Sequence, residues 1–82
     1  MESKLALIGI IVTDWDATPA LNAVLHEYAL YIIGRMGIPY KSRNRNIISV
    51  AIDAPPDIAN TLAGKIGRLP GLTAKMMTAK GD

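Results

Sequence analysis

The fold of this chain is decided by its most apolar stretch, KLALIGIIVT, which occupies residues 4–13. The stretch is short and rich in β-branched residues, which favours a strand over a helix. Side chains of a strand alternate between its two faces. The two rows are Leu5, Leu7, Gly9, Ile11 and Ala6, Ile8, Ile10, Val12. Because both rows are apolar, the sequence predicts a strand that is covered on both faces.

A helix is predicted to follow, from Thr18 to about Ile33. Thr18 can cap the first turn, and Pro19 suits the first helical position. Apolar residues then recur three and four positions apart, as on an amphipathic helix: Leu21, Val24, Leu25, Tyr28, Ala29, Ile32 and Ile33. The helix is expected to end near residues 34–37, where a glycine can adopt the left-handed conformation of a C-cap.

A hairpin is predicted next. It consists of a short strand at residues 38–41, a polar turn at 42–46 and a longer strand at 47–54. Pro39 confines the first of these strands to a sheet edge or a strand start. The second strand alternates apolar Ile48, Val50 and Ile52 with Ser49, Ala51 and Asp53, which is typical of a half-buried strand.

A second helix opens at residues 55–57, where prolines and an acidic residue suit a helix start. Ile58, Leu62 and Ile66 share one of its sides, and residues 67–71 end it. A last strand covers residues 72–78, and residues 80–82 are expected to form a frayed tail.

The predicted order is β-α-β-β-α-β within one domain, residues 1–82. Such a doubled split βαβ unit is the α+β ferredoxin-like sandwich, in which a four-stranded antiparallel sheet carries two helices on one face. Half of the 82 residues are hydrophobic, and the uncovered sheet face would expose one apolar row of the first strand. Soluble monomers seldom expose such a patch. A homodimer or tetramer that covers this face is therefore expected.

Composition narrows the function classes. There is no cysteine, which rules out disulfides, thiolate metal ligands and cysteine nucleophiles, and fits a reducing, cytoplasmic compartment. The longest apolar run, residues 5–12, is far shorter than the roughly 20 residues of a membrane span. A net charge of +2 is too small to indicate a nucleic-acid surface by itself.

No catalytic set is visible in the sequence. Ser3, Ser42 and Ser49 lack a nucleophile-elbow setting, and the carboxylates form no close pair on one element. His26 is the sole histidine, and Leu30 stands four residues later, so the helix offers no histidine pair to a metal. The sequence therefore predicts neither an enzyme nor a metal site, and it leaves any cofactor unidentified.

Two groups of polar residues remain as candidate binding positions. His26 lies beside the apolar stripe of the first predicted helix, and Glu27, Tyr31 and Arg35 follow at intervals of four as one stripe. These residues fit either an exposed helix face with local contacts or the wall of a ligand site. Lys41, Arg43 and Arg45 form the second group.

The second group crowds three positive charges into five residues at the predicted hairpin tip, with Tyr40 as its only aromatic neighbour. Charged turns are commonly solvated, but such a tip can also contact an anion or a nucleic acid. Trp15 lies between Asp14 and Asp16. Its side chain fits either a position that covers the core above the helix start or a contact with a partner protein.

Two longer motifs resemble a known family. They are LHEY followed by YIIGRMGIPY, residues 25–28 and 31–40, and DAP followed by LAGKIGRLPG, residues 53–55 and 62–71. They resemble the regulators proposed for the iron-only hydrogenase system, and the resemblance covers nearly the whole chain. It implies a ferredoxin-like domain, similar to ACT modules and to the C-terminal domain of nickel-responsive repressors, which are oligomeric and sense small ligands or metals. The motif positions carried over as candidate ligand-binding residues are His26, Tyr28, Tyr31, Arg35 and Tyr40.

The chain departs from the nickel repressors because it lacks the cysteine and histidine cluster of a square-planar site. It also has too few residues before the first strand for a ribbon-helix-helix reader of DNA. The expected function is a non-enzymatic, ligand-sensing regulatory oligomer that acts through a protein partner. The alternatives are a small nucleic-acid-binding transcriptional regulator that uses residues 41–45, or an assembly accessory for an iron-sulfur enzyme without a ligand of its own.

Overall fold

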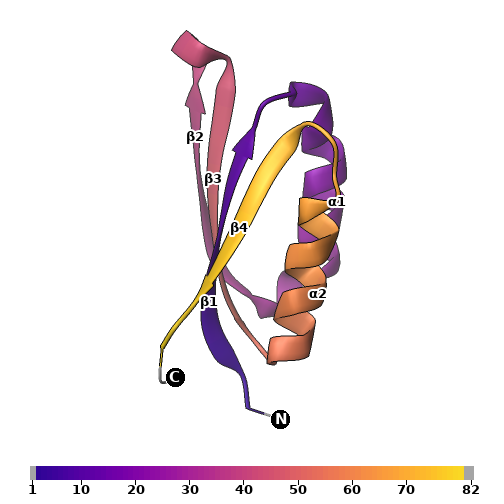
Figure 1. Cartoon of the computed structure of the whole chain (residues 1–82), viewed down its shortest axis with the longest axis vertical. Coiled ribbons are helices and arrows are strands. Elements are labelled where there is room, and N and C mark those ends of the chain that lie inside the picture. Colours follow the sequence, from indigo (N-terminus) through magenta and orange to yellow (C-terminus); the bar gives the residue numbers. More distant parts are fainter. Residues whose placement is uncertain (1, 81–82) are drawn as a thin grey trace.

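The computed structural model of the chain describes residues 2–80, and its elements follow the order β-α-β-β-α-β (Figure 1). The strands are β1 Lys4–Val12, β2 Ile32–Tyr40, β3 Arg45–Ala54 and β4 Leu72–Thr78. The helices are α1 Thr18–Glu27 and α2 Pro56–Gly67. Short 3-10 turns lie at Trp15–Ala17, Ala29–Tyr31 and Lys41–Arg43. Two residues of the tail predicted at 80–82 lie outside the described residues.

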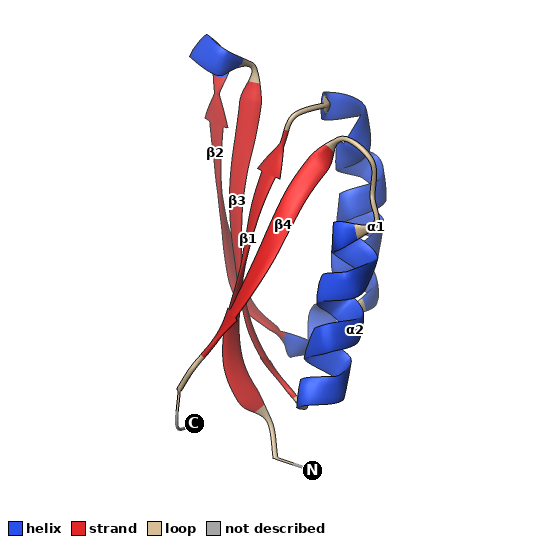
Figure 2. Cartoon of the chain, viewed as in Figure 1, coloured by secondary structure: helices blue, strands red, loops and turns tan. Residues whose placement is uncertain are grey.

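The four strands form one antiparallel sheet in the order β2-β3-β1-β4. Both helices cover the same face of this sheet, and the other face is left open (Figures 1 and 2). This arrangement confirms the α+β ferredoxin-like fold predicted from the sequence. In residues 2–80, no helix is long and apolar enough to cross a membrane.

The core lies between the helices and the covered sheet face. One row of β1 is buried there, as predicted, while Leu5, Leu7 and Ile11 of the other row stay 39–47% exposed. The buried side chains of the strands are Ala6, Ile8, Ile10, Val12, Ile48, Val50, Ile52 and Ala54. Those of the two helices are Leu21, Leu25, Ala59, Leu62 and Ile66. Burial of this apolar surface is the main free-energy gain of folding.

The first helix is shorter than the sequence predicted. It ends at Glu27, and β2 begins at Ile32, so residues 34–37 are strand and not a helix cap. The apolar residues 28–33 fit a helical stripe and a strand about equally well. Pairing with β3 decides for a strand from Ile32 onward, because eight of the nine residues of β2 pair with β3, and residues 29–31 form the 3-10 turn that leads into it. The predicted strand at 38–41 therefore began about six residues too late.

The start of α1 also differs from the prediction. A 3-10 turn precedes the helix, and the Asp14 side chain accepts a hydrogen bond from the Asp16 amide at 3.0 Å. Thr18 is the first residue of the helix and makes no cap hydrogen bond. Its buried hydroxyl has no hydrogen-bond partner in the described part of the chain. Asp14, and not Thr18, therefore caps this end of the helical segment.

Candidate functional site

A groove lies between α1 and the edge strand β2. Its volume is about 340 Å³. The residues that line it are Asn22, Leu25, His26, Ala29, Ile32 and Arg35. Leu25 is buried and Ile32 is half-buried, so the groove has an apolar floor beneath polar side chains.

Arg35 reaches the groove because of its register in the sheet. It pairs with Val50, which is fully buried on the covered face, so the Arg35 side chain also extends to the helix side. Its Nη2 donates a hydrogen bond to Asn22 Oδ1 on α1 at 3.3 Å. Since a guanidinium has five N–H donors, most of its donors stay available at the groove.

Asn22 and His26 stand four residues apart on α1 and thus on the same side of the helix. The groove therefore brings together an amide, an imidazole and a guanidinium above an apolar floor. Hydrogen-bond donors of this kind match a small carboxylate or phosphate. A group of three or more potential metal-ligating carboxylate, thiol or imidazole side chains is not found in residues 2–80.

The sequence named two of these groove residues, His26 and Arg35, but expected Arg35 at the end of the first helix, whereas it lies in β2. Glu27, Tyr31 and Arg35 do not form one helical stripe, because Tyr31 lies in a 3-10 turn and Arg35 in β2. Asn22 was missed as a candidate. Its position four residues before His26 was the available signal.

Tyr28 and Tyr31 lie outside the groove lining and pack against the core. The Lys65 ammonium lies 5.0 Å from the centroid of the Tyr28 ring and 3.0 Å from Glu27 Oε2. These contacts, with Tyr28 first and Glu27 second, raise the pKa of Lys65 above its usual value. Tyr28 and Glu27 thus join the end of α1 to α2.

The remaining candidates gather at the hairpin tip. Tyr40, Arg43 and Arg45 line a shallow depression together with Ile11 and Ile47. The tip is held in place by Trp15, whose Nε1 donates a hydrogen bond to Asn44 Oδ1 at 2.8 Å.

Arg45 is partly engaged within the turn. Its Nη1 donates to the carbonyl oxygens of Arg43 at 3.1 Å and Asn44 at 3.3 Å. Lys41 lies in the preceding 3-10 turn. The candidate residues therefore belong to three separate places: His26 and Arg35 to the groove, Tyr28 and Tyr31 to the margin of the core, and the rest to the hairpin tip.

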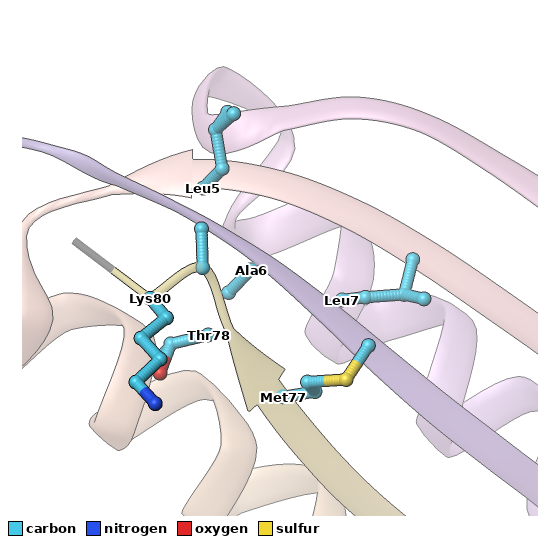
Figure 3. A pocket seen from close by; sticks show the side chains of 7 residues that line it. Leu5, Ala6, Leu7, Met77, Thr78 and Lys80 are labelled. Atoms are coloured by element: carbon cyan, nitrogen blue, oxygen red, sulfur yellow. The ribbon is translucent and has the colours of Figure 1, made fainter. Parts of the chain in front are cut away.

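The sheet face opposite the helices, called the open face below, is apolar. Eight large hydrophobic side chains on it are 39% to 66% exposed: Leu5, Leu7, Ile11, Met36, Ile38, Tyr40, Ile47 and Met77. Leu7 and Met77 are cross-strand partners and lie side by side in a depression that Leu5 and Lys80 also line (Figure 3). The sequence predicted this face from β1 alone. It placed Met36 at the end of the first helix, and it did not assign Ile38 and Tyr40 of the predicted strand 38–41 to this face.

Taken together, the fold and these surfaces define a small ferredoxin-like domain with a polar groove beside one sheet edge and an apolar open face. Residues 4–76 match the family model described as "TM1266-like: Iron-only hydrogenase system regulator, putative". The chain belongs to this family, which confirms the resemblance found in its motifs.

Three solved structures are similar to the chain. The uncharacterized protein TM1266 from Thermotoga maritima shares 28% sequence identity with a TM-score of 0.91, over 96% of this chain and 100% of that one. The C-terminal domain of the MgtC protein from Mycobacterium tuberculosis shares 10% identity with a TM-score of 0.74, over 98% of this chain and 92% of that one.

The third structure is a formyltetrahydrofolate deformylase from Pseudomonas putida KT2440, with 15% identity and a TM-score of 0.65. That match covers 92% of this chain but only 29% of the deformylase. The second and third structures show likeness of fold alone. A search of curated proteins found no match.

Proposed function

We propose that the chain is a non-enzymatic regulatory module, which binds a small anionic ligand in the groove between α1 and β2 and acts as an oligomer through a protein partner. The observation that carries this proposal is the Arg35 guanidinium, which Asn22 holds beside His26 over an apolar floor. The family description as a regulator supports a role that requires no chemical step.

The groove residues favour a particular ligand class. Specific small-molecule sites are mostly apolar, with a few placed polar groups that orient the ligand. Here Arg35 can donate two parallel hydrogen bonds to a carboxylate or phosphate, and Leu25 and Ile32 can contact a short apolar group. A small organic acid or amino acid fits this combination better than a large planar ligand does.

The same strand connects the groove to the open face. Neighbouring residues of a strand point to opposite faces, so Arg35 faces the groove while Met36 is exposed on the open face. A ligand that draws Arg35 towards α1 would also shift the backbone that carries Met36. This link supports regulation through assembly.

Exposed apolar side chains beside the groove support a protein partner. Leu30 is 95% exposed in the 3-10 turn, and Ile33 is 62% exposed at the bulge that interrupts β2. Their neighbours Ala29 and Ile32 line the groove. A partner that covers Leu30 and Ile33 would therefore sense whether the groove is occupied.

The test is a thermal-shift screen with amino acids, small dicarboxylates and inorganic phosphate, followed by calorimetry on any hit. A ligand at 100 times its Kd stabilises the native state by about 2.7 kcal/mol. Arg35→Met is expected to abolish the shift, whereas Lys41→Met, which removes one positive charge at the hairpin tip, is expected to preserve it. A flat screen, or equal loss in both variants, would contradict the proposal.

A second candidate function is nucleic-acid binding by the hairpin tip, favoured by the depression that Tyr40 shares with Arg43 and Arg45. Phosphate contacts release counterions, so such binding would weaken steeply with added salt. A titration of labelled single-stranded DNA and RNA at 50 and 200 mM salt tests it, with Arg43→Met as the variant that should bind less.

A further inference from the structure

We infer that the open face is covered by the open face of a second copy, whose strands run antiparallel to those of the first, so that Arg45 of each copy pairs with Asp53 of the other. This inference rests on the oligomeric part of the proposed function and does not depend on a ligand. It commits the apolar face to one occupant and to one orientation.

The size of the open face suits a stable dimer. The molecule is 41 Å long and 17 Å deep, and the sheet lies along these two directions (Figure 1). These extents bound the area of the face at about 700 Å², which is of the same order as the roughly 800 Å² that each partner buries in a standard-size interface. Its exposed side chains are mainly aliphatic or methionine, as in the core of a homodimer interface.

Charge at the two ends of β3 decides the orientation. Arg45 and Asp53 belong to the row of β3 that faces away from the buried Ile48, Val50 and Ile52. They stand eight residues apart, with Ser49 midway. Asp53 is exposed, and its carboxylate has no hydrogen bond or ion pair in residues 2–80.

A twofold axis that relates two stacked sheets lies between them. It can run along the strands or across them, and these two directions give two orientations of the second copy. An axis along the strands brings both basic tips, residues 41–45, to the same end of the dimer, where like charges repel. An axis across the strands at the level of Ser49 sends the tips to opposite ends. It also places Arg45 above Asp53 of the partner subunit, and this happens twice because of the symmetry.

At the middle of the open face the two central strands carry only small residues, which suits this axis, while Met36 stands at that level on the edge strand β2. Gly9 on β1 pairs with Ser49 on β3, and a Cβ added at Gly9 would meet no atom within 4 Å. The two sheets can therefore approach closely at the axis. Leu7 and Ile11, two residues to either side of Gly9, then reach the same level as Ile11 and Leu7 of the second copy and can pack against them.

Lys75 pairs with Gly9 and so lies near the level of the axis, but on the edge strand β4. Its flexible side chain can extend past the sheet edge and keep its ammonium in water. The angle of about 30° between aligned, packed sheets separates the two edge strands further. Lys75 therefore does not oppose the arrangement.

Charge reversal tests the inference on the intact chain. In a dimer of the Arg45→Asp variant, each new aspartate faces Asp53 of the other copy, which gives two acidic pairs. In a dimer of the Asp53→Arg variant, each new arginine faces Arg45 of the other copy, which gives two basic pairs. Each single variant is expected to weaken the dimer by about tenfold or more, as like charges across an interface do. An equimolar mixture of the two variants, and the double variant, restore opposite charges and should recover the dimer.

Sedimentation equilibrium from 1 to 100 µM gives the dissociation constants, and circular dichroism confirms folding. Asp16→Arg reverses an exposed charge outside the open face and should leave association unchanged. A wild-type chain that stays at 8.8 kDa at 100 µM, or single variants whose mixture does not recover the dimer, would overturn the inference. Neither Arg45 nor Asp53 lines the groove, so the ligand-induced thermal shift tests the proposed function separately.

Discussion

The loop between α2 and β4 depends on a glycine that no other residue can replace without strain. Gly71 has a φ of +85°, and a Cβ added there would lie 2.8 Å from the Asp14 Cβ and 3.3 Å from the Ala17 Cβ. Its carbonyl oxygen accepts hydrogen bonds from the amides of Thr13 at 2.9 Å and Asp14 at 3.0 Å, and from the Thr13 hydroxyl at 3.2 Å. Gly71 thereby ties the end of β1 to the start of β4.

Gly71→Ala should therefore destabilise the fold by two effects. The left-handed conformation costs an L-residue about 1–2 kcal/mol. The contact with Asp14 forces the two loops apart, which weakens hydrogen bonds that each contribute about 1 kcal/mol. We expect a total loss of about 2–4 kcal/mol, a large share of the 5–15 kcal/mol that holds a typical domain together.

Urea unfolding, followed by circular dichroism at one fixed protein concentration, measures this loss. The matched control is Gly64→Ala within α2, where an added Cβ meets only Arg68 nitrogens at 3.7 and 3.9 Å. Because alanine is about 1 kcal/mol better than glycine inside a helix, the control should stabilise the chain. A Gly71→Ala variant as stable as the wild type would refute the reasoning.

Two further predictions concern the core and the helix pair. Leu62 is fully buried, so Leu62→Ala should cost about 2–5 kcal/mol in urea unfolding, and an unchanged midpoint would contradict its place in the core. The pKa of Lys65 is raised above 10.5 by Tyr28 and then Glu27, so the stability it contributes is fully present below pH 10.5 and is lost as the pH rises through the higher folded-state pKa. The stability difference between wild type and Lys65→Met should therefore shrink above pH 10.5, and a difference that grows there would contradict the sign.

Much of the fold could be read from local patterns. The last strand, residues 72–78, was predicted with the bounds that the structure has. The second helix, α2, begins at Pro56, within residues 55–57 where its start was predicted. In both elements, the apolar period and the flanking glycine or proline indicate the same boundary. Local signals that agree in this way are strong predictors.

The candidate site could be predicted only in part. The motif named His26 and Arg35, but Arg35 was expected on a helical stripe with Glu27 and Tyr31, and it lies in β2 instead. Arg35 meets α1 because β2 pairs with β3 in the register that places it opposite Val50. Asn22, which completes the groove, stands four residues before His26, but its hydrogen bond to Arg35 follows from the tertiary structure alone.

The sequence by itself determined that β1 is apolar on both faces, since this follows from residue type and spacing within one element. It also determined that two helices shield only one of these faces, since this follows from the order of the predicted elements. Only the tertiary structure decided where α1 ends, because residues 28–33 satisfy both a helical and a strand pattern. The hydrogen bonds that β3 offers between Arg45 and Ile52 resolve that ambiguity, because they make a strand of the chain from Ile32 onward. They also create the groove at one side of β2 and extend the apolar open face at the other.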